Sequence, residues 1–312
     1  MSDLRFRSLS PSQVAGHVAG HVAGVAPAKL NLFLEVLSRR PDGYHELRTV
    51  FHEIDLADEL RVELRPGATR DSIEVSGLAL DVGPERNLAL RAAEAFRRHV
   101  GDCPRVHVDL EKRIPAGSGM GGGSSDAAFV LRALVELTGS KAGSDRLAVA
   151  AREVGADVAF FLAGGTALGA GRGDELTPLP DPGPLVFLLA LPRFPLSTAT
   201  VYSHVDLITP RADVSSFAEG LRGRPRGKPV GGCFNRLEAA ASRAEPRIAE
   251  LLAELRVSTR VDWSMTGSGS TLFAPMSTWE DAASVARSVT CGRRFDLRVV
   301  KSFGARPASA RS

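Results

Sequence analysis

The feature that most limits how this chain can fold is a glycine-rich stretch between a strand pattern and a helix pattern. Residues 117–123 contain five glycines. Apolar residues alternate with polar ones over residues 106–110, which predicts a strand. Apolar residues recur at helical spacing from residue 127 to about residue 137, which predicts a helix. The chain must therefore pass from a strand directly into a helix through a glycine loop.

Such a loop has two interpretations, and the local residues leave both open. Glycines allow positive φ and a close approach to a ligand, and the N–H groups at a helix start favour an anion. The loop is therefore either a phosphate-binding loop or a glycine turn whose serines, Ser124 and Ser125, cap the helix. A Walker loop is excluded because no Gly-Lys-Ser/Thr ends the stretch. The His-Arg-Asp and Asp-Phe-Gly motifs of protein kinases are also absent from the sequence.

Composition excludes several other classes of function. The 312 residues carry a formal net charge of only +3, and no basic run suggests nucleic-acid binding. The three cysteines are far apart, which excludes a disulfide framework and indicates a reducing compartment. The sequence contains no run of about 18 apolar residues, so no membrane span is predicted. We expect a cytoplasmic protein, a monomer or weak homodimer, without a nucleic-acid or membrane partner.

Two of the scarce residue types fall in suggestive places. The chain has few lysines, and two of them are Lys29, in a strand pattern over residues 25–37, and Lys112, just before the glycine loop. Lys29, Asn31 and Glu35 share one face of that strand, which either lies at the surface or looks into a site. The two tyrosines are Tyr44, at the exit of a Pro-Asp-Gly turn, and Tyr202.

One acidic residue also stands out. Asp157 directly precedes the apolar run 158–162, where it either caps a helix or is buried with a partner.

The rest of the chain predicts two domains with short tails. We expect a flexible tail over residues 1–24, a first domain over 25–180, a second over 181–303 and a disordered tail over 304–312. The proline-rich segment 178–184 marks the boundary. Helices are predicted over residues 87–99, 144–154, about 233–242, 246–255 and 279–287. Strands are predicted over 185–191 and 295–301, and a loop over the arginine- and glycine-rich segment 213–231.

Taken together, these stretches resemble the GHMP small-molecule kinases. Pro-Ala-Lys-Leu-Asn-Leu (residues 27–32), Lys-Arg-Ile-Pro with the glycine loop and Ser-Ser-Asp-Ala-Ala (112–128), and Met-Thr-Gly-Ser-Gly-Ser (265–270) are similar to the three motifs of that superfamily. Arg-Pro-Asp-Gly-Tyr-His-Glu-Leu (40–47) and Gly-Ala-Asp-Val-Ala-Phe-Phe (155–161) resemble the branch that phosphorylates 4-diphosphocytidyl-2-C-methyl-D-erythritol in the non-mevalonate (MEP) pathway.

The resemblance implies an α+β fold with two domains. The N-terminal domain would be like domain 2 of ribosomal protein S5, and the C-terminal domain would be a ferredoxin-like α/β sandwich. ATP would be the phosphoryl donor, accompanied by Mg²⁺, for which the resemblance assigns no protein ligand. The residues implied to bind ATP are Pro115, Ala116, Gly117, Ser118, Gly119, Met120, Gly121, Gly122, Gly123, Ser124, Ser125, Lys112, Asn87 and Leu88.

The resemblance also implies roles at the acceptor. Asp157 would be the general base for the substrate hydroxyl, and Lys29 would lie beside it. Tyr44 and His45 would hold the cytosine, with Tyr202 stacking opposite. The full set implied to bind the cytidine diphosphate methylerythritol is Asn31, Tyr44, His45, Thr198, Tyr202, Gly267 and Ser268.

Two positions depart from the family pattern. Residue 159 is Ala where Pro is usual, and residue 236 is Arg where Asp is usual. Neither is a proposed catalytic residue. Two alternatives stay open, namely another GHMP kinase with a different acceptor and a non-catalytic nucleotide-binding regulator on this fold. The Tyr44-His45 turn argues against the first, and the presence of Lys29 and Asp157 argues against the second.

Overall fold

The computed structural model describes residues 14–18, 20–80, 83–194, 196–207, 211–289 and 294–304. The chain divides into two compact units that are interleaved in sequence. The first unit contains the residues up to Ala28, Leu56–Ala116 and Gly121–Gly164. The second contains Lys29–Asp55, Gly117–Met120 and the residues from Gly165 onward. The glycine loop therefore contributes residues to both units.

Strands of the first unit form part of a mixed sheet with the order β1-β2-β3-β5-β4. The strands β2 and β3 are long and continue into the second unit. Strands β4 and β5 are parallel, and helix α1 lies between them in the chain, as a parallel connection requires. The five strands are β1 (Val14–Val18), β2 (His21–Arg39), β3 (His45–Arg65), β4 (Ser72–Gly77) and β5 (Arg105–Lys112).

The predicted N-terminal tail is partly wrong. Residues predicted as flexible up to residue 24 include β1 and the start of β2, which pair antiparallel around Gly20. Gly20 has a φ of +101°, which suits a tight turn between two strands. The chain there repeats Val-Ala-Gly-His, and it turns at the second glycine of the repeat, Gly20. Residues 1–13 and the tail from residue 305 lie outside the described residues.

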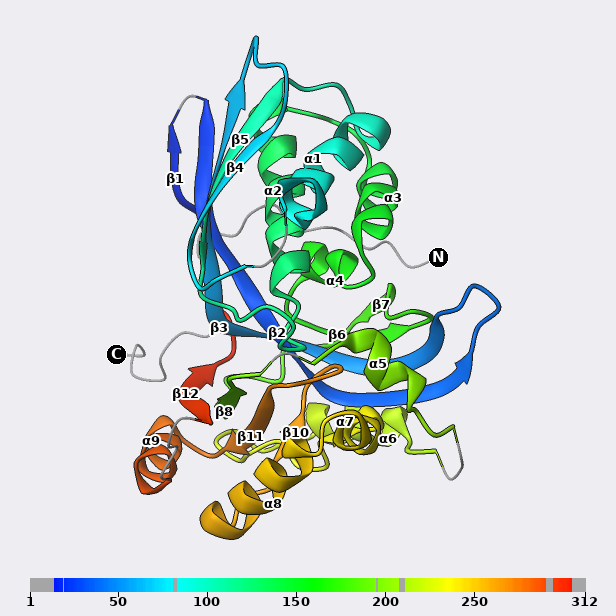
Figure 1. The fold of residues 1–312 in the computed structure, drawn as a ribbon, viewed down its shortest axis with the longest axis vertical. Coiled ribbons are helices and arrows are strands. Elements are labelled where there is room, and N and C mark those ends of the chain that lie inside the picture. The colour runs from blue at the N-terminus through cyan, green and yellow to red at the C-terminus, as the bar shows by residue number, and fades with distance from the viewer. Residues whose placement is uncertain are drawn as a thin grey trace. The chain divides into compact units, whose positions relative to one another are not determined.

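Helices of the first unit gather on one side of its strands (Figure 1). Along β5, buried and half-buried residues alternate, and the buried side chains of Val106, Val108 and Leu110 belong to the apolar core of this unit. The central helix α2 buries ten consecutive residues from Ser125 to Leu134. The helices are α1 (Leu88–His99), α2 (Gly122–Thr138), α3 (Ser144–Val154) and α4 (Val158–Ala163), with a short 3₁₀ turn, η1 (Pro84–Arg86).

The second unit contains the remaining parts of β2 and β3 and a separate antiparallel sheet. Strand β6 pairs with β3 and with β7, and the short β9 pairs with β2. The separate sheet has the order β10-β11-β8-β12. The strands are β6 (Thr166–Ala170), β7 (Glu175–Pro178), β8 (Val186–Pro192), β9 (Phe234–Asn235), β10 (Ser264–Met265), β11 (Leu272–Met276) and β12 (Phe295–Lys301).

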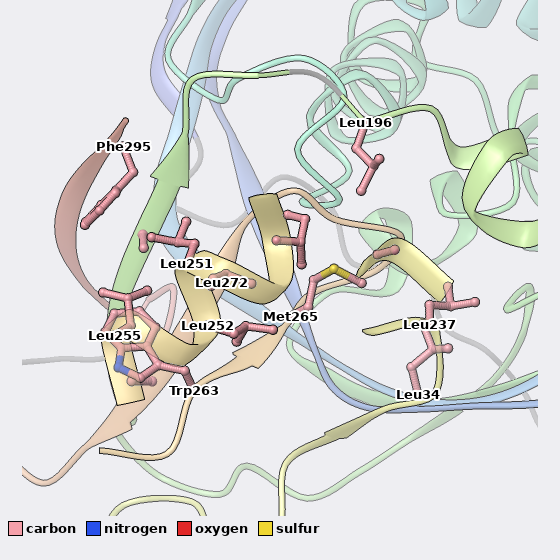
Figure 2. Close-up of a cluster of buried hydrophobic side chains, with 14 of the residues drawn as sticks. Leu34, Leu196, Leu237, Leu251, Leu252, Leu255, Trp263, Met265, Leu272 and Phe295 are labelled. Carbon is pink, nitrogen blue, oxygen red and sulfur yellow. The ribbon is translucent and has the colours of Figure 1, made fainter. Parts of the chain in front are cut away.

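A large apolar core lies between this sheet and helices of the second unit. Figure 2 shows Leu251, Leu252 and Leu255 of α8 meeting Leu272 of β11 and Trp263. All five side chains are at most 3% exposed. The helices of this unit are α5 (Thr198–Ser203), α6 (Val214–Arg222), α7 (Leu237–Ala244), α8 (Arg247–Thr259) and α9 (Trp279–Ser288).

One predicted loop is a helix. The segment 213–231 was predicted as a loop, but α6 occupies Val214–Arg222. Asp213 caps it by accepting hydrogen bonds from the N–H groups of Ser215 and Ser216, and Phe217 and Leu221 are buried. The domain boundary predicted at residue 180 stays a prediction. Across the described residues, no helix combines the length and apolar character that crossing a bilayer requires.

Candidate active site

The glycine loop connects β5 to α2 through backbone conformations that favour glycine. Gly117, Gly119 and Gly121 have φ of +63°, +76° and +74°. A Cβ on Gly119 would also lie 2.2 Å from the carbonyl oxygen of Thr266. The prediction that these glycines take positive φ is confirmed, and their close approach to a ligand stays a prediction. Pro115 and Ala116 lead into this turn, and the backbone of Ser118 accepts a hydrogen bond from Thr271 N.

The N-terminus of α2 presents polar groups suited to a phosphate and its counter-ion. Helix α2 begins at Gly122, so its first backbone N–H groups have no partner within the helix. Ser125 and Asp126 are buried in its first turns. Among the described residues, no hydrogen-bond partner is found for Ser125 Oγ or Asp126 Oδ1. Buried unpartnered oxygens of this kind are suitable ligands for a hard divalent cation.

Leu88 lies against the loop, whereas Asn87 has a structural contact. A Cβ on Gly123 would be 3.4 Å from Leu88 Cδ1. The side chain of Asn87 is buried and caps α1 by accepting a hydrogen bond of 2.9 Å from Ala89 N. The predicted roles of both residues in ATP binding stay predictions.

Lys112 forms ion pairs with two buried carboxylates. Its Nζ donates to Asp58, which is fully buried, and to Asp126 Oδ2 at 2.8 Å. Burial disfavours the charged amine, but the two carboxylates outweigh it and raise the pKa of Lys112. Burial raises the pKa of Asp126 to about 7, with Lys112 opposing and Asp58 adding to the shift. The ammonium group of Lys112, predicted to bind ATP, therefore joins β5 to α2.

Lys29 sits in a different polar cluster, within the second unit. Its Nζ is buried and donates to Asn31 Oδ1 and to the carbonyl oxygen of Gly119 in the glycine loop. Its backbone N donates to Met120 O at 3.0 Å. Asn31 is fixed in turn, because its N–H donates to Thr266 Oγ1 at 2.9 Å. The polar face of β2 is thus not at the surface.

The second glycine turn, around Gly267, completes this cluster. A Cβ on Gly267 would lie 2.8 Å from Gly119 O and 3.2 Å from Lys29 Nζ. Asn235 fastens the turn by donating to Met265 O at 2.6 Å and to Gly267 O at 2.8 Å.

The departure at residue 236 has its own local explanation. Arg236 binds both carboxylate oxygens of the buried Glu35, at 2.7 and 2.8 Å. This pair joins the start of α7 to β2, and it does not involve the glycine turns.

Asp157 is placed by α4 in the first unit. It occupies the N-cap position, and its backbone oxygen accepts a hydrogen bond from Phe161 N. Its side chain makes no capping bond, and every residue of α4 after it is buried. Two residues earlier, Gly155 lies beside the loop, since a Cβ there would be 3.7 Å from Ser124 Oγ. The predicted contact between Asp157 and Lys29 stays a prediction.

Aromatic side chains gather around the turn between β2 and β3. The rings of His45 and Tyr202 lie 4.8 Å apart at 31°. Tyr44 is 54% exposed, and the guanidinium of Arg172 lies over its ring at 4.9 Å. Thr198, which lies in α5 with Tyr202, forms a hydrogen bond of 2.8 Å between its hydroxyl and the hydroxyl of Ser268. The structure thus joins His45 to Tyr202 and Thr198 to Ser268, and it gives Tyr44 an unexpected partner.

Sequence reasoning missed Asp58, Thr266 as a hydrogen-bonding residue, and Arg172. Asp58 interrupts the apolar face that Ile54, Leu56, Leu60 and Val62 form at alternate positions of β3, and a charged residue on such a face was an available signal. Arg172 lies between Gly171 and Gly173. That pattern predicts a turn but does not indicate what the arginine side chain contacts.

Comparison with known proteins identifies the superfamily and the branch. Residues 87–165 match the GHMP kinases N terminal domain. The 4-diphosphocytidyl-2-C-methyl-D-erythritol kinase of Exiguobacterium sibiricum is 38% identical over 251 residues, which cover 80% of this chain and 87% of the relative. The enzyme of the same name from Shouchella clausii is 33% identical over 291 residues, covering 90% and 95%.

Solved structures agree with that assignment. A crystal structure of 4-(cytidine 5'-diphospho)-2C-methyl-D-erythritol kinase has a TM-score of 0.72 and 36% identity, covering 90% of this chain and all of that one. Homoserine kinase from Cytophaga hutchinsonii, at 20% identity and a TM-score of 0.60 over 92% and 96% of the two chains, shares the fold. The expected two-domain α+β GHMP kinase fold is therefore confirmed. The chain belongs to the 4-diphosphocytidyl-2-C-methyl-D-erythritol kinase family of the GHMP kinases.

Proposed function

We propose that this chain transfers the γ-phosphoryl group of ATP to the 2-hydroxyl of 4-diphosphocytidyl-2-C-methyl-D-erythritol, giving the 2-phosphate and ADP. Family membership gives the reaction, which is a step of the MEP pathway of isoprenoid precursor synthesis. The geometry that supports it best is the hydrogen bond from Lys29 Nζ to Gly119 O, which places a buried ammonium group on the glycine loop itself. Phosphoryl transfer depends mainly on such positioning and on charge stabilisation.

The residues supply each part of this chemistry. The loop amides and the N-terminus of α2 bind the phosphates of ATP. The oxygen of the substrate's 2-hydroxyl attacks the γ-phosphorus of ATP, and Asp157 accepts the proton of that hydroxyl. The bond between the γ-phosphorus and the oxygen that bridges it to the β-phosphate breaks, and ADP leaves with that oxygen. Lys29 stabilises the negative charge on the transferring group. Asn31 and Thr266 hold Lys29 through the hydrogen bonds described above, so that the ammonium group is in place before ATP binds.

Ser125 and Asp126 would hold the Mg²⁺ that accompanies ATP. The support is the pair of buried oxygens, Ser125 Oγ and Asp126 Oδ1, for which the described residues offer no hydrogen-bond partner. Such hard oxygen donors suit Mg²⁺, which keeps most of its other positions for water and phosphate. When bound, the ion would neutralise phosphate charge.

The acceptor's cytosine would bind at the aromatic cluster. His45 and Tyr202 already lie ring to ring, and the exposed face of Tyr44 is available for stacking. Thr198, Gly267 and Ser268 would line the path from this cluster to Lys29.

The chain would work in the cytoplasm as a monomer or weak homodimer. Cys103 and Cys233 are unpaired thiols, which agrees with a reducing compartment. Gel filtration across a range of concentrations would test the oligomeric state.

The reaction is tested by measuring ADP release with Mg-ATP and four acceptors. These are the cytidyl substrate, mevalonate, homoserine and galactose. Turnover with the cytidyl substrate alone is expected. Turnover with another acceptor would retain the phosphoryl-transfer site and reject the cytidine assignment. ATP binding without turnover of any acceptor would favour a regulatory protein on this fold.

Asp157→Asn tests the base. The amide cannot accept the hydroxyl proton, so kcat should fall by about 10²- to 10⁴-fold with little change in thermal stability. Asp145→Asn, in the exposed first turn of α3, is the matched control and should keep the kcat of the parent. Wild-type kcat in Asp157→Asn would remove Asp157 from the base role.

A further inference from the structure

Asp58 lies at the point where β5 leaves the sheet and enters the glycine loop. The ladder between β3 and β5 ends at the pair Glu59 and Glu111. Beyond that pair, the next amides of the chain have lost their partners on β3. Buried amides must find other acceptors, since an unpaired one is energetically costly. The side chain of Asp58 supplies them.

Both carboxylate oxygens of Asp58 are used by three consecutive residues. Oδ1 accepts hydrogen bonds from Arg113 N at 2.6 Å and from Ile114 N at 2.8 Å, and Oδ2 accepts one from Lys112 Nζ. Pro115 follows and has no N–H group. Arg113 and Ile114 therefore provide the last backbone donors before the loop, and both donate to one fully buried side chain.

The far end of the loop is joined to the same carboxylate through Lys112. Lys112 Nζ also binds Asp126 Oδ2, in the first turns of α2. The packing there is close, since a Cβ on Gly122 would be 3.2 Å from Lys112 Nζ and 3.0 Å from Ile114 Cγ2. One buried network thus fixes the chain on both sides of the loop.

We infer that Asp58 is a positioning residue for the phosphates of ATP, because it fixes the entrance of the glycine loop directly and its exit through Lys112. The inference rests on one part of the proposed function, that the loop binds ATP. Asp58 touches no substrate in this role. It sets where the loop amides lie, and a displacement of about 1 Å is enough to weaken such a site strongly.

The chain offers a matched control at the other end of the same strand. Asp71 is also a buried carboxylate that accepts a backbone hydrogen bond, from Val106 N at 2.9 Å, and it also pairs with a cation, Arg97. Val106 lies near the start of β5, about 20 Å from Lys112 along the strand. Asp71 and Asp58 therefore make similar contacts, but only Asp58 makes them at the loop.

The experiment compares Asp58→Asn with Asp71→Asn. Binding of ATP is measured by calorimetry without any acceptor, and KM for each substrate is measured where turnover occurs. Asp58→Asn should weaken ATP binding and raise the KM for ATP by about tenfold, with the acceptor KM within about twofold of wild type. Hydrogen exchange at Arg113 and Ile114 should accelerate. Asp71→Asn should lower the melting temperature but leave ATP binding within about twofold of wild type.

Two results would overturn the inference. One is wild-type ATP affinity in Asp58→Asn, and the other is an equal loss of affinity in Asp71→Asn. If Asp58→Asn does not fold, Asp58→Glu keeps the negative charge and moves it by one methylene. It is then compared with Asp71→Glu under the same criteria. Because ATP binding is measured without acceptor, failure of the proposed acceptor would leave this test intact.

Discussion

Lys29 and Lys112 are both buried lysines in contact with the glycine loop, but they are held by different groups. Lys29 is 3% exposed and Lys112 is 4% exposed. Lys112, in the first unit, donates to two carboxylates. Lys29, in the second unit, donates to the amide oxygen of Asn31 and to a backbone carbonyl oxygen.

The difference indicates how one residue type serves two purposes. The carboxylates around Lys112 compensate its charge, so that the ammonium group joins β5 to α2. The oxygens of Asn31 and Gly119 fix the position of Lys29 beside the glycine loop. We therefore expect Lys112 to matter first for the stability of the first unit, and Lys29 to matter first for turnover.

Lys112→Met should have the largest effect on stability. It leaves Asp58 and Asp126 buried without their shared cation, and breaking a buried ion pair in this way costs about 3–5 kcal/mol. Urea denaturation would measure the loss. Lys141→Met, at an exposed position, is the control and should change the free energy of unfolding by less than about 0.5 kcal/mol. An equally small loss in Lys112→Met would contradict the structural role.

Lys29→Met should instead reduce turnover. Loss of one charge-stabilising donor lowers kcat by about 10²- to 10³-fold in comparable sites. Steady-state kinetics with Lys29→Met and Lys29→Arg would measure it, and the arginine variant tests whether positive charge alone suffices. The comparison of the two lysines would fail if Lys29→Met kept wild-type kcat.

A titratable group in each unit should make stability depend on pH in opposite directions. Burial lowers the pKa of His52, in the second unit, to about 4, with Asp181 opposing and Arg224 adding to the shift. The stability from neutral His52 is complete above pH 6.5 and is lost as the pH falls toward 4, by about 3 kcal/mol. The pKa of Asp126, in the first unit, is raised to about 7. Its contribution is complete below pH 3.8 and is lost as the pH rises toward 7.

Denaturation of His52→Gln and Asp126→Asn between pH 4 and 8 separates the two groups. The stability difference between wild type and His52→Gln should grow as the pH rises from about 4 to 6.5. The difference between wild type and Asp126→Asn should shrink as the pH rises to about 7. Parallel curves for the two variants would show that these groups do not titrate as assigned.

The fold was largely readable from the sequence because its strongest signals are local. Helix α3 has the bounds 144–154 that its periodicity predicts, and the strand, loop and helix from residue 106 onward follow the spacing of apolar residues. The segments missed include β1, β4 and α6, which are short, and the six residues of β4 are mostly exposed. A short segment contains too few turns or alternations to establish a period, even in α6, where Phe217 and Leu221 are buried at helical spacing.

The candidate site was readable only where it uses sequence motifs. The positive φ of the loop glycines follows from residue type. The partners of Asp58 do not, since its hydrogen bonds reach residues 54 to 56 positions away in the chain. Contacts over that distance depend on how the strands pair, and no local pattern encodes them.

The smallest expected effect concerns Arg172, whose side chain is partly exposed. Its guanidinium lies over the Tyr44 ring and pairs with Asp174 at 3.0 Å, both near the surface. A cation–π contact at an exposed site contributes about 0.5–1 kcal/mol. Arg172→Ala should therefore raise the KM for the cytidyl substrate by about two- to fivefold and leave the KM for ATP unchanged.

Tyr44→Ala provides the upper limit for the same surface. Loss of stacking on a base costs about 1–3 kcal/mol, so the acceptor KM should rise by about 5- to 150-fold. Arg193→Ala removes another exposed arginine, paired with Asp296, and should leave both KM values unchanged. If Arg172→Ala and Tyr44→Ala raised the KM for ATP as much as that for the acceptor, the aromatic cluster would not be the cytidine site.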